Sequence, residues 1–236
     1  MKRAIVFSLE LTLPEPTEDD KRADFERLRD ASGLEDLTPS VGSLRALPYA
    51  IRKNHFNVSP VIGLFDKAPV LLSPSAERPH AIAMDIGTTN IVLRLYDMKT
   101  NVKRAEYQFR NPQVAFGEDI LSRIQYCMKG GLKELRESLV EGINEAIKTV
   151  SLEASLSTQD VFAVVVSANT VMTHLLIGLD VRNIPVSPYI PVVSRALFFR
   201  ATEIGLHINP EALVYLFPNA GSYVGGDIIS GVLATG

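Results

Sequence analysis

The first part of the chain alternates apolar and polar positions and then shows helical signals. Residues 3–13 have the two-residue period of a half-buried strand, which Pro14 ends. Acidic residues follow Thr17, so its hydroxyl is expected to cap a helix that fades at Gly33. A second helix is predicted over residues 41–51.

A hairpin and a linker follow these helices. Two apolar runs, 58–65 and 69–72, are separated by a short polar turn, which predicts a pair of antiparallel strands. Segment 73–79 contains two prolines, two serines and two charged residues and is the best linker in the chain. We therefore predict a small α+β domain over residues 1–77 and a second domain over residues 78–236.

The second domain begins with three strands joined by tight turns, a pattern typical of an antiparallel meander. Two helical stripes follow, then an uninterrupted apolar strand that is expected to be buried on both faces. The expected elements are strands 81–86, 90–96 and 102–109, helices 120–128 and 132–150, strand 161–166, helix 170–179, strand 213–217 and a helix from 225. The order β-β-β-α-β-α-β-α predicts an α/β domain.

Composition is that of an ordinary globular protein, with 46% hydrophobic and 22% charged residues among 236. Lys and Arg number 24 against 27 Asp and Glu, and the net charge of −3 gives no overall positive field. No nucleic-acid partner is therefore expected. No run approaches the roughly 18 to 20 apolar residues that span a bilayer, and the N-terminus lacks a signal-peptide pattern. We expect a soluble, cytoplasmic protein with no membrane partner.

The single cysteine, Cys127, excludes an intrachain disulfide and a cysteine-ligated iron–sulfur cluster held by this chain alone. The histidines His55, His80, His174 and His207 show no ligand-like spacing, which argues against structural zinc. Cys127 lies on a predicted helix among apolar residues, so we expect it to be a small buried hydrophobic side chain.

The most informative motif lies between the first two strands of the second domain. Asp85 ends a strand, where a carboxylate can hold the water shell of Mg²⁺. Gly87, Thr88 and Thr89 form a turn that can present backbone N–H groups and hydroxyls to phosphate oxygens. A side chain at Gly87 would keep a phosphate away. The alternative is a hairpin turn whose polar side chains satisfy local backbone groups.

Two further clusters of polar and small residues follow predicted strands. Asn169 and Thr170 come at the end of the buried strand, where ligands gather in open α/β sheets. Gly225, Gly226 and Asp227 open a helix whose free N–H groups can approach phosphate or ribose. Close packing of the helix against a strand explains the two glycines equally well.

Two other polar features have plainer interpretations. Glu118 and Asp119 precede a predicted helix, where capping is favoured over catalysis. His174 lies off the apolar stripe of its helix, so it faces either a cleft or a partner, or else it is a solvated or capping histidine. No residue is singled out as catalytic.

Taken together, residues 81–236 resemble the first, ribonuclease H-like subdomain of the actin-like ATPase superfamily, which includes sugar kinases and heat-shock chaperones. A closer resemblance is to the reductive activators of corrinoid proteins. The segments that carry it are 85–89, 111–124, 169–176 and 218–227. Residues 13–28 are similar to the middle domain that precedes the ATPase domain in these activators.

This resemblance implies an ATP-dependent activator that returns Co(II) corrinoid proteins to Co(I) in methyl transfer. ATP and Mg²⁺ are then the cofactors, with Mg²⁺ at Asp85, and a corrinoid protein of a methyltransferase system is the partner. A homodimer is left open. The family also carries a 2Fe–2S domain and a second phosphate loop. This chain has one cysteine and stops at Gly236, so we expect the cluster to lie outside it and the chain to be a fragment or a truncated relative.

The first phosphate loop alone does not separate the activators from other members of the superfamily. A sugar kinase or an activator of acyl-CoA dehydratases is the alternative enzyme. A non-catalytic docking or dimerisation module that keeps the fold is the alternative of a different class. Such a module is expected to bind its partner equally with and without nucleotide.

Overall fold

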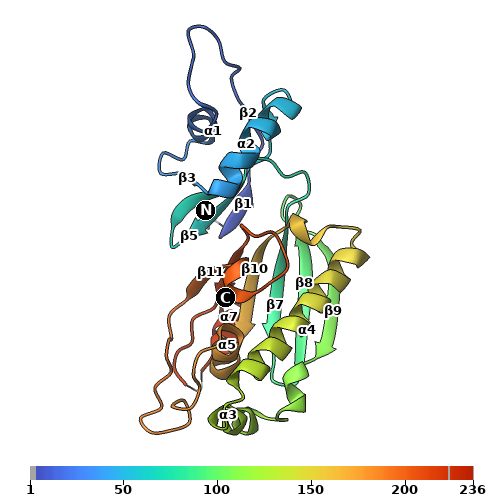
Figure 1. Ribbon diagram of the computed structural model, residues 1–236, viewed down its shortest axis with the longest axis vertical. Coiled ribbons are helices and arrows are strands. Elements are labelled where there is room, and N and C mark those ends of the chain that lie inside the picture. Colours follow the sequence, from blue (N-terminus) through green and yellow to red (C-terminus); the bar gives the residue numbers. More distant parts are fainter. Residues whose placement is uncertain (1–3, 223, 236) are drawn as a thin grey trace.

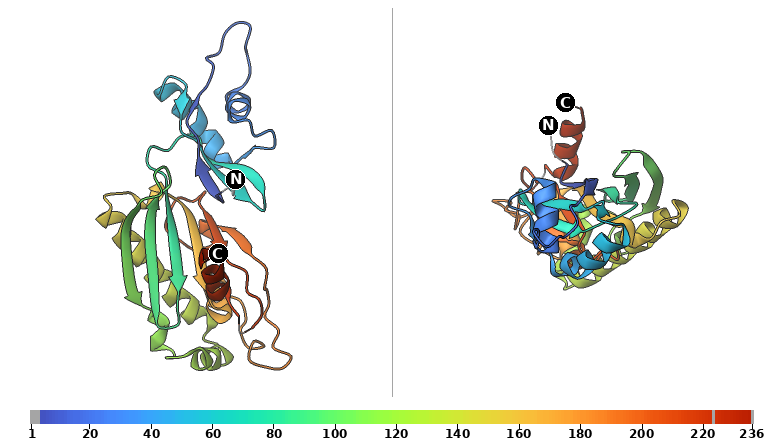
Figure 2. Two further views of the ribbon diagram at one scale, coloured as in Figure 1. Left: turned by 180° about the vertical axis from the view of Figure 1, so that it is seen from behind. Right: turned by 90° about the horizontal axis from the view of Figure 1, so that it is seen from above.

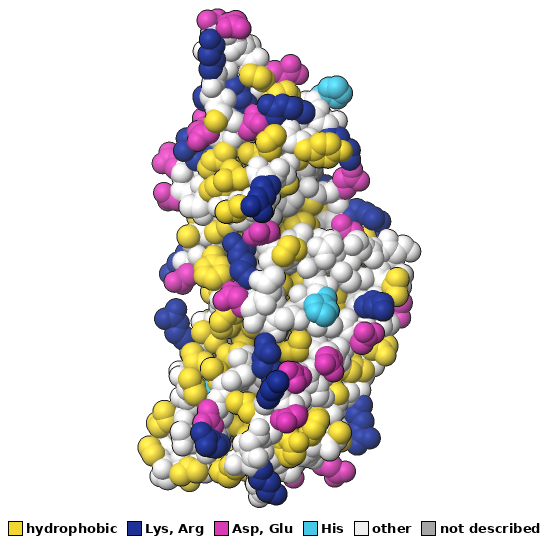
Figure 3. All heavy atoms as spheres, viewed as in Figure 1, with side chains coloured by type: hydrophobic (Ala, Val, Ile, Leu, Met, Phe, Trp, Pro, Cys, Tyr) yellow, Lys and Arg dark blue, Asp and Glu magenta, His cyan; other side chains and the backbone are white. Residues whose placement is uncertain are grey.

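The computed structural model describes residues 4–222 and 224–235 (Figure 1). A small α+β part lies at one end of the long axis, and a larger sheet with its helices forms the other end. Charged side chains of both signs are interspersed on the face that Figure 3 shows. Within the described ranges, every helix is too short or too polar to cross a membrane.

Residues 4–79 form two small sheets and two helices. The larger sheet has the strand order β1-β5-β6-β3, and the smaller one pairs β2 with β4. Helix α2 packs against β6. The elements are β1 Val6–Ser8, β2 Leu11–Thr12, α1 Asp24–Ser32, β3 Thr38–Pro39, α2 Val41–Lys53, β4 Asn57–Val58, β5 Val61–Phe65 and β6 Ala68–Ser73.

The single strand expected over residues 3–13 is wrong, because this segment forms two short strands with different partners. β1 pairs antiparallel with β5, whereas β2 pairs antiparallel with β4. Residue 3 lies outside the described residues. The alternating pattern thus belongs to two short strands in two different sheets, and not to one long strand.

The helix expected to begin at Thr17 begins instead at Asp24. The Thr17 hydroxyl accepts a hydrogen bond from the Asp20 N–H at 3.0 Å and closes a local turn. The buried guanidinium of Arg27 donates to the carbonyl oxygens of Pro14 and Asp20. These bonds hold the segment in a non-helical path until Asp24.

Other expectations for this part are confirmed. Gly33 ends α1 in the left-handed conformation, with φ of 66°. The second helix is α2, and the apolar runs pair as the antiparallel hairpin β5–β6. Its turn residues Asp66 and Lys67 have φ of 47° and 75°, as a two-residue hairpin turn requires.

The larger part contains the predicted meander, helices and buried strands. Its strands are β7 His80–Ile86, β8 Asn90–Asp97, β9 Lys103–Arg110, β10 Val161–Ala168, β11 Leu197–Arg200 and β12 Leu213–Leu216. Its α-helices are α3 Ile120–Met128, α4 Leu132–Glu153, α5 Thr170–Ile177, α6 Ala201–Ile204 and α7 Gly226–Thr235. Two short 3₁₀-helices are η1 Pro112–Ala115 and η2 Thr158–Asp160.

The six strands form one sheet in the order β11-β12-β10-β7-β8-β9. β7, β10 and β12 run parallel, and β8, β9 and β11 are antiparallel to their neighbours. The sequence pattern missed β11, a four-residue edge strand after a proline-rich stretch. Hydrogen bonding to β12 makes this segment a strand, and its own short sequence does not indicate one.

Helices cover the two faces of this sheet unequally. α3, α4 and α5 lie on one face, where the main apolar core of the protein is buried. α7 lies on the opposite face and packs against β10, as the view from behind shows (Figure 2). The Ser167 and Ser230 hydroxyl oxygens, 2.8 Å apart, join β10 to α7. Much of the face beside α7 is left open, and it carries the candidate site.

A shared apolar cluster joins the small part to the large sheet. It contains Val6, Val61 and Leu72 from the first part and Phe162, Ala163 and Leu213 from the second. A Cβ atom on Gly63 would lie 2.5 Å from a methyl carbon of Leu213, so β5 and β12 pack closely. The domain division near residue 78 stays a prediction, and these contacts cross it.

Candidate functional site

Asp85 lies at the end of β7 on the open face of the sheet. Ile82, Met84 and Ile86 alternate with it and are buried on the helical face. Asp85 therefore points into a hollow of about 470 Å³ between the sheet and α7. The residues lining this hollow are Ala83, Met84, Asp85, Arg94, Val165, Ser167, Phe217, Asp227, Ser230 and Gly231.

The hollow brings together two carboxylates that lie far apart in the sequence. Desolvation raises the pKa of Asp85, the nearby charge of Asp227 raises it further, and Arg94 acts in the opposite sense. Arg94 is itself held by an ion pair of its Nε with Glu106 Oε2 at 3.1 Å. A cation between Asp85 and Asp227 would relieve the repulsion that raises this pKa.

The carbonyl groups of the turn after Asp85 point into the protein. The Gly87 oxygen accepts from Asn111 Nδ2 at 2.8 Å, and the Thr89 oxygen accepts from Asn111 N at 2.8 Å. The Thr88 oxygen accepts from Arg123 Nη2 at 2.5 Å. In a trans peptide the C=O and the next N–H point in opposite directions, so the Thr88 and Thr89 amides face away from these partners.

The amides of Thr88 and Thr89 have no acceptor among the described residues. In residues 4–222 and 224–235, neither of these N–H groups donates a hydrogen bond. Adjacent free amides of this kind form an anion-binding concavity. A Cβ atom on Gly87 would lie 2.6 Å from the Asn90 carbonyl oxygen, so closure of the turn itself requires glycine.

Asn169 is placed beside this turn, and Thr170 is turned away from it. Asn169 caps α5 by accepting from Met172 N at 3.0 Å, and its Nδ2 lies 3.4 Å from the Thr88 hydroxyl oxygen. The Thr170 hydroxyl is buried and donates to the Gly221 carbonyl at 2.7 Å. Thr170 thus holds a neighbouring loop, whereas Asn169 contacts the turn directly.

The two glycines that open α7 are explained by close packing. A Cβ atom on Gly225 would lie 2.4 Å from Asn169 Cα, and one on Gly226 would lie 2.9 Å from Phe217 Cβ. Gly226 N also donates to Asn219 Oδ1 at 3.0 Å. The contacts place Asp227 at the hollow. A ligand role for the glycines stays a prediction.

The donor set fits a magnesium–nucleotide better than an all-protein metal site. Among the described residues, no group of three or more His, Cys, Asp or Glu side chains gathers to hold a metal ion. Mg²⁺ usually binds through one or two carboxylates with water and phosphate oxygens. Asp85 and Asp227 are two carboxylates of this kind at one hollow, and the binding of Mg²⁺ and phosphate there stays a prediction.

The sequence interpretation missed the role of Asn111 and Arg123. Both side chains are fully buried behind the turn. The expected capping at the start of α3 is confirmed, since Asp119 and Ser122 form a capping box. The sequence holds one sign of a buried Arg123, because this charged residue precedes Ile124 on the apolar stripe of α3.

His174 is neither solvated nor exposed to a cleft or a partner, and its ring joins α5 to a loop instead of capping the helix. It is fully buried, with Nδ1 2.7 Å from the Thr170 oxygen and Nε2 accepting from Val192 N at 3.1 Å. It therefore holds the proline-rich loop against α5. Cys127 is buried as expected, and burial with the nearby Asp180 charge raises its thiol pKa to about 11.

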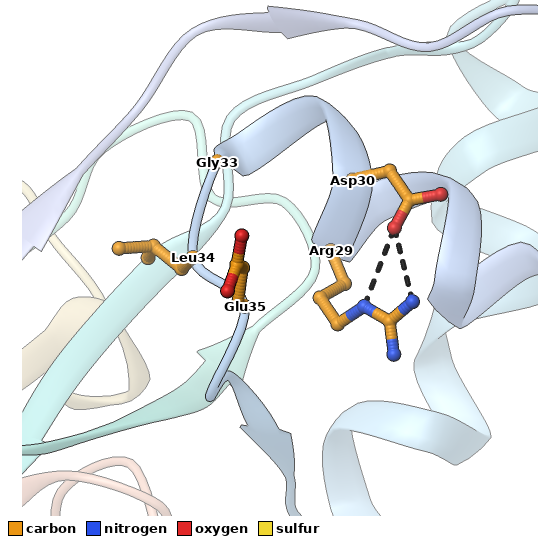
Figure 4. A pocket seen from close by; sticks show the side chains of 5 residues that line it. All are labelled: Arg29, Asp30, Gly33, Leu34 and Glu35. Carbon is orange, nitrogen blue, oxygen red and sulfur yellow. Dashed lines mark hydrogen bonds and ion pairs between the residues drawn. The ribbon is translucent and has the colours of Figure 1, made fainter.

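A second hollow, of about 480 Å³, lies in the N-terminal part at the end of α1 (Figure 4). Arg29, Asp30, Gly33, Leu34 and Glu35 line it. Arg29 forms an ion pair with its neighbour Asp30 at 3.0 Å, so its guanidinium is already engaged. The first hollow is the better candidate because two of the predicted residues, Asp85 and Asp227, line it.

A mixed six-stranded sheet with this strand order, with α3, α4 and α5 on one face, α7 on the other and a polar turn after its first strand, is an actin-like ATPase fold. The model of the RACo middle region matches residues 80–236, and the model of the RACo linker region matches residues 5–71. The chain therefore belongs to the RACo family. The first part, expected as a middle domain, is the part that the linker-region model matches.

Individual relatives agree with this assignment. The chain is 34% identical over 158 residues to the corrinoid activation enzyme RamQ of Eubacterium limosum. The matched segment covers 66% of this chain and 27% of RamQ. It is also similar to a solved structure of a reductive activator for corrinoid, iron-sulfur protein, with a TM-score of 0.88 and 36% identity. That match covers 98% of this chain and 38% of the other. The chain thus spans well under half the length of these relatives.

Proposed function

We propose that this chain supplies a phosphate-binding half-site of an ATP-dependent activator that reduces Co(II) corrinoid proteins to Co(I). The observation that carries the proposal is the turn at Gly87, whose carbonyls accept hydrogen bonds on one side, while the Thr88 and Thr89 amides near Asp85 have no acceptor in the part of the chain that the structure describes. Two relatives are activators of corrinoid systems, which supports a corrinoid protein as the partner.

Each site residue has a defined task in this proposal. The Thr88 and Thr89 N–H groups bind phosphate oxygens, and Asn169 holds the Thr88 hydroxyl in place. Asp85 and Asp227 hold the water shell of Mg²⁺. ATP, when bound, supplies the free energy for the uphill electron transfer. The amides of the turn bind and orient its phosphates.

The residues of this chain do not fit a 2Fe–2S cluster. Such a cluster needs four protein ligands, and the chain has one thiol, which is buried and carries a raised pKa. The electron carrier is therefore proposed to lie outside these residues. The purified chain is expected to be colourless and to give no Co(I) absorption from a Co(II) corrinoid with ATP and an artificial donor.

Nucleotide binding is tested by titrating the ¹⁵N-labelled chain with Mg·ATP and recording amide spectra. The Thr88 and Thr89 signals are expected to move, with an affinity weaker than about 1 µM because one phosphate loop provides few contacts. Asp85→Asn should weaken binding at least about tenfold by removing a charge from the ion site. Asp66→Asn, in the remote hairpin turn, is the matched control and should bind as wild type.

Three results would contradict the proposal. If the Thr88 and Thr89 signals do not move at millimolar Mg·ATP, the turn does not bind phosphate. If the Asp85→Asn variant binds Mg·ATP as tightly as wild type, Asp85 does not hold the Mg²⁺ ion. Equal binding of a corrinoid protein with and without nucleotide would favour a docking module. Homodimer formation stays a prediction, which sedimentation of the same sample measures.

A further inference from the structure

Arg123 is a buried cation that forms no ion pair with any described residue, and the one carboxylate whose charge acts on it is that of Asp119 at the start of α3. Its side chain has 0% exposure, and the ion pairs of the described residues do not include it. Burial lowers the pKa of its guanidinium. Taking a charge out of water is costly, and an apolar residue at this position of α3 would avoid that cost. The side chain therefore needs an explanation beyond packing.

All the partners of this guanidinium are neutral acceptors around the turn after Asp85. Nε donates to the Gly117 oxygen at 3.0 Å, and Nη1 donates to Gln113 Oε1 at 3.2 Å. Nη1 also contacts the Met172 sulfur at 3.3 Å. Nη2 donates to the Thr88 oxygen. One side chain thus joins the turn to η1, α3 and α5.

Asn111 and Gln113 extend these contacts into one buried network. Asn111 Nδ2 donates to the Gly87 oxygen, and its Oδ1 accepts from Gln113 N at 3.0 Å. Gln113 Nε2 donates to the Leu135 oxygen at 2.9 Å, which anchors the network to α4. Asn111 and Gln113 also have 0% exposure. The three side chains are shielded from water, and the bonds among them and to Leu135 are buried, whereas the bonds to Gly87, Thr88 and Gly117 are partly buried. In a low-dielectric interior such bonds are stronger than at the surface.

We propose that Arg123 and Asn111 are positioning residues for phosphate binding, an inference that rests on the proposed function. They hold the Gly87, Thr88 and Thr89 carbonyls inward, so that the free amides face the ligand. Arg123 has a second effect, because the Thr88 carbonyl and the Thr89 N–H belong to one peptide group. A charged donor at that carbonyl polarises the peptide and makes the Thr89 N–H a stronger donor to phosphate.

Two variants remove single parts of the network. Arg123→Lys keeps the positive charge but loses the planar fork that reaches several acceptors at once. Asn111→Ser keeps an N-cap acceptor for η1 and removes only the donor to Gly87. Arg136→Lys is the matched control, because Arg136 Nη2 also donates to a backbone carbonyl, that of Ile204 at 2.9 Å, away from the turn.

Two measurements on the full chain separate positioning from overall stability. Amide spectra and ¹⁵N relaxation of the ligand-free variants report the order of Thr88 and Thr89, and Mg·ATP titrations give the affinity. We expect both network variants to loosen these two amides and to bind at least about tenfold more weakly, with the signals of β10 and α4 unchanged. Arg136→Lys should leave the turn and the affinity as in wild type.

The outcomes also separate this inference from the proposed function. If Thr88 and Thr89 stay as ordered in both network variants as in wild type, Arg123 and Asn111 do not position the turn. If the turn loosens but the affinity is unchanged, positioning has no part in phosphate binding, and the inference is overturned. If the wild-type chain shows no response to Mg·ATP, the proposed function fails first and the inference falls with it.

Discussion

Gly225 lies so close to Asn169 that a Cβ atom on the glycine would be 2.4 Å from the Asn169 Cα. Asn169 caps α5 and also reaches the Thr88 hydroxyl. The start of α7, the cap of α5 and the phosphate turn therefore form one packed unit. The order of the turn depends on how closely α7 approaches α5.

Gly225→Ala is expected to disturb this unit. The added methyl group meets backbone atoms of Asn169 and Thr170, which have little freedom to move, so the cost should be about 1–3 kcal/mol of unfolding free energy. Gly231→Ala is the control on the same helix, because its methyl group enters open space. That change should be neutral or stabilise by up to about 1 kcal/mol through helix propensity. Urea denaturation measures both, and equal effects would contradict the packing role.

The local elements of the second domain were predictable because their signals are local. The alternation in β8 predicts a strand buried on one face, and the unbroken apolar run of β10 predicts a strand buried on both faces. The buried network was not predictable, since Arg123 is separated from its partner Thr88 by 35 positions and only the fold brings them together. Thr17 shows the converse, because a good capping sequence is overridden by the bonds of Arg27.

Asp85→Asn is expected to stabilise the chain while it weakens Mg·ATP binding. The pKa of Asp85 is raised in the folded state, so the native protein binds more protons than the unfolded chain between the unfolded and folded pKa values. Its charge therefore reduces stability as pH rises through the folded pKa. The gain at pH 7 should be below about 1 kcal/mol, because the side chain is exposed to solvent.

This gain should shrink as the pH falls through the raised pKa of Asp85, because the side chain then takes up its proton. Thermal melts of both proteins from pH 4 to pH 8 measure the difference. Asp66→Asn, at an exposed position in the β5–β6 turn, is the control for the loss of a surface carboxylate. A variant less stable than wild type at pH 7 would contradict the electrostatic account.

His174→Phe should destabilise the proline-rich loop and alter the pH dependence of stability. The ring accepts from Val192 N–H and contacts the Thr170 carbonyl, and the loss of these hydrogen bonds should cost about 1 kcal/mol each. Burial lowers the pKa of His174 below 6.5. The unfolded chain thus binds the proton more tightly, and wild-type stability should fall as pH drops from 6.5.

Urea midpoints at pH 5, 6 and 7 test this sign. The His174→Phe variant should show a flatter dependence than wild type over this range, because the depressed group is absent. His207→Phe is the control, since His207 is exposed and its ring makes no contact with the loop in the described residues. An unchanged slope in the His174 variant would assign the acid sensitivity to other groups.

Leu213→Ala should loosen both parts of the chain, because its fully buried side chain belongs to the cluster that they share. Removing the side chain leaves a cavity and should cost about 2–5 kcal/mol. Leu28→Ala is the matched control, since Leu28 is equally buried in a cluster confined to the first part.

Amide hydrogen exchange at Ile62 in β5 and Val164 in β10 reports each part separately. Leu213→Ala should speed exchange at both amides, whereas Leu28→Ala should speed it at Ile62 and leave Val164 protected. Faster exchange at Val164 alone in the Leu213 variant would mean that the shared cluster does not couple the two parts, and residues 1–77 would then fold independently of the sheet that carries Asp85.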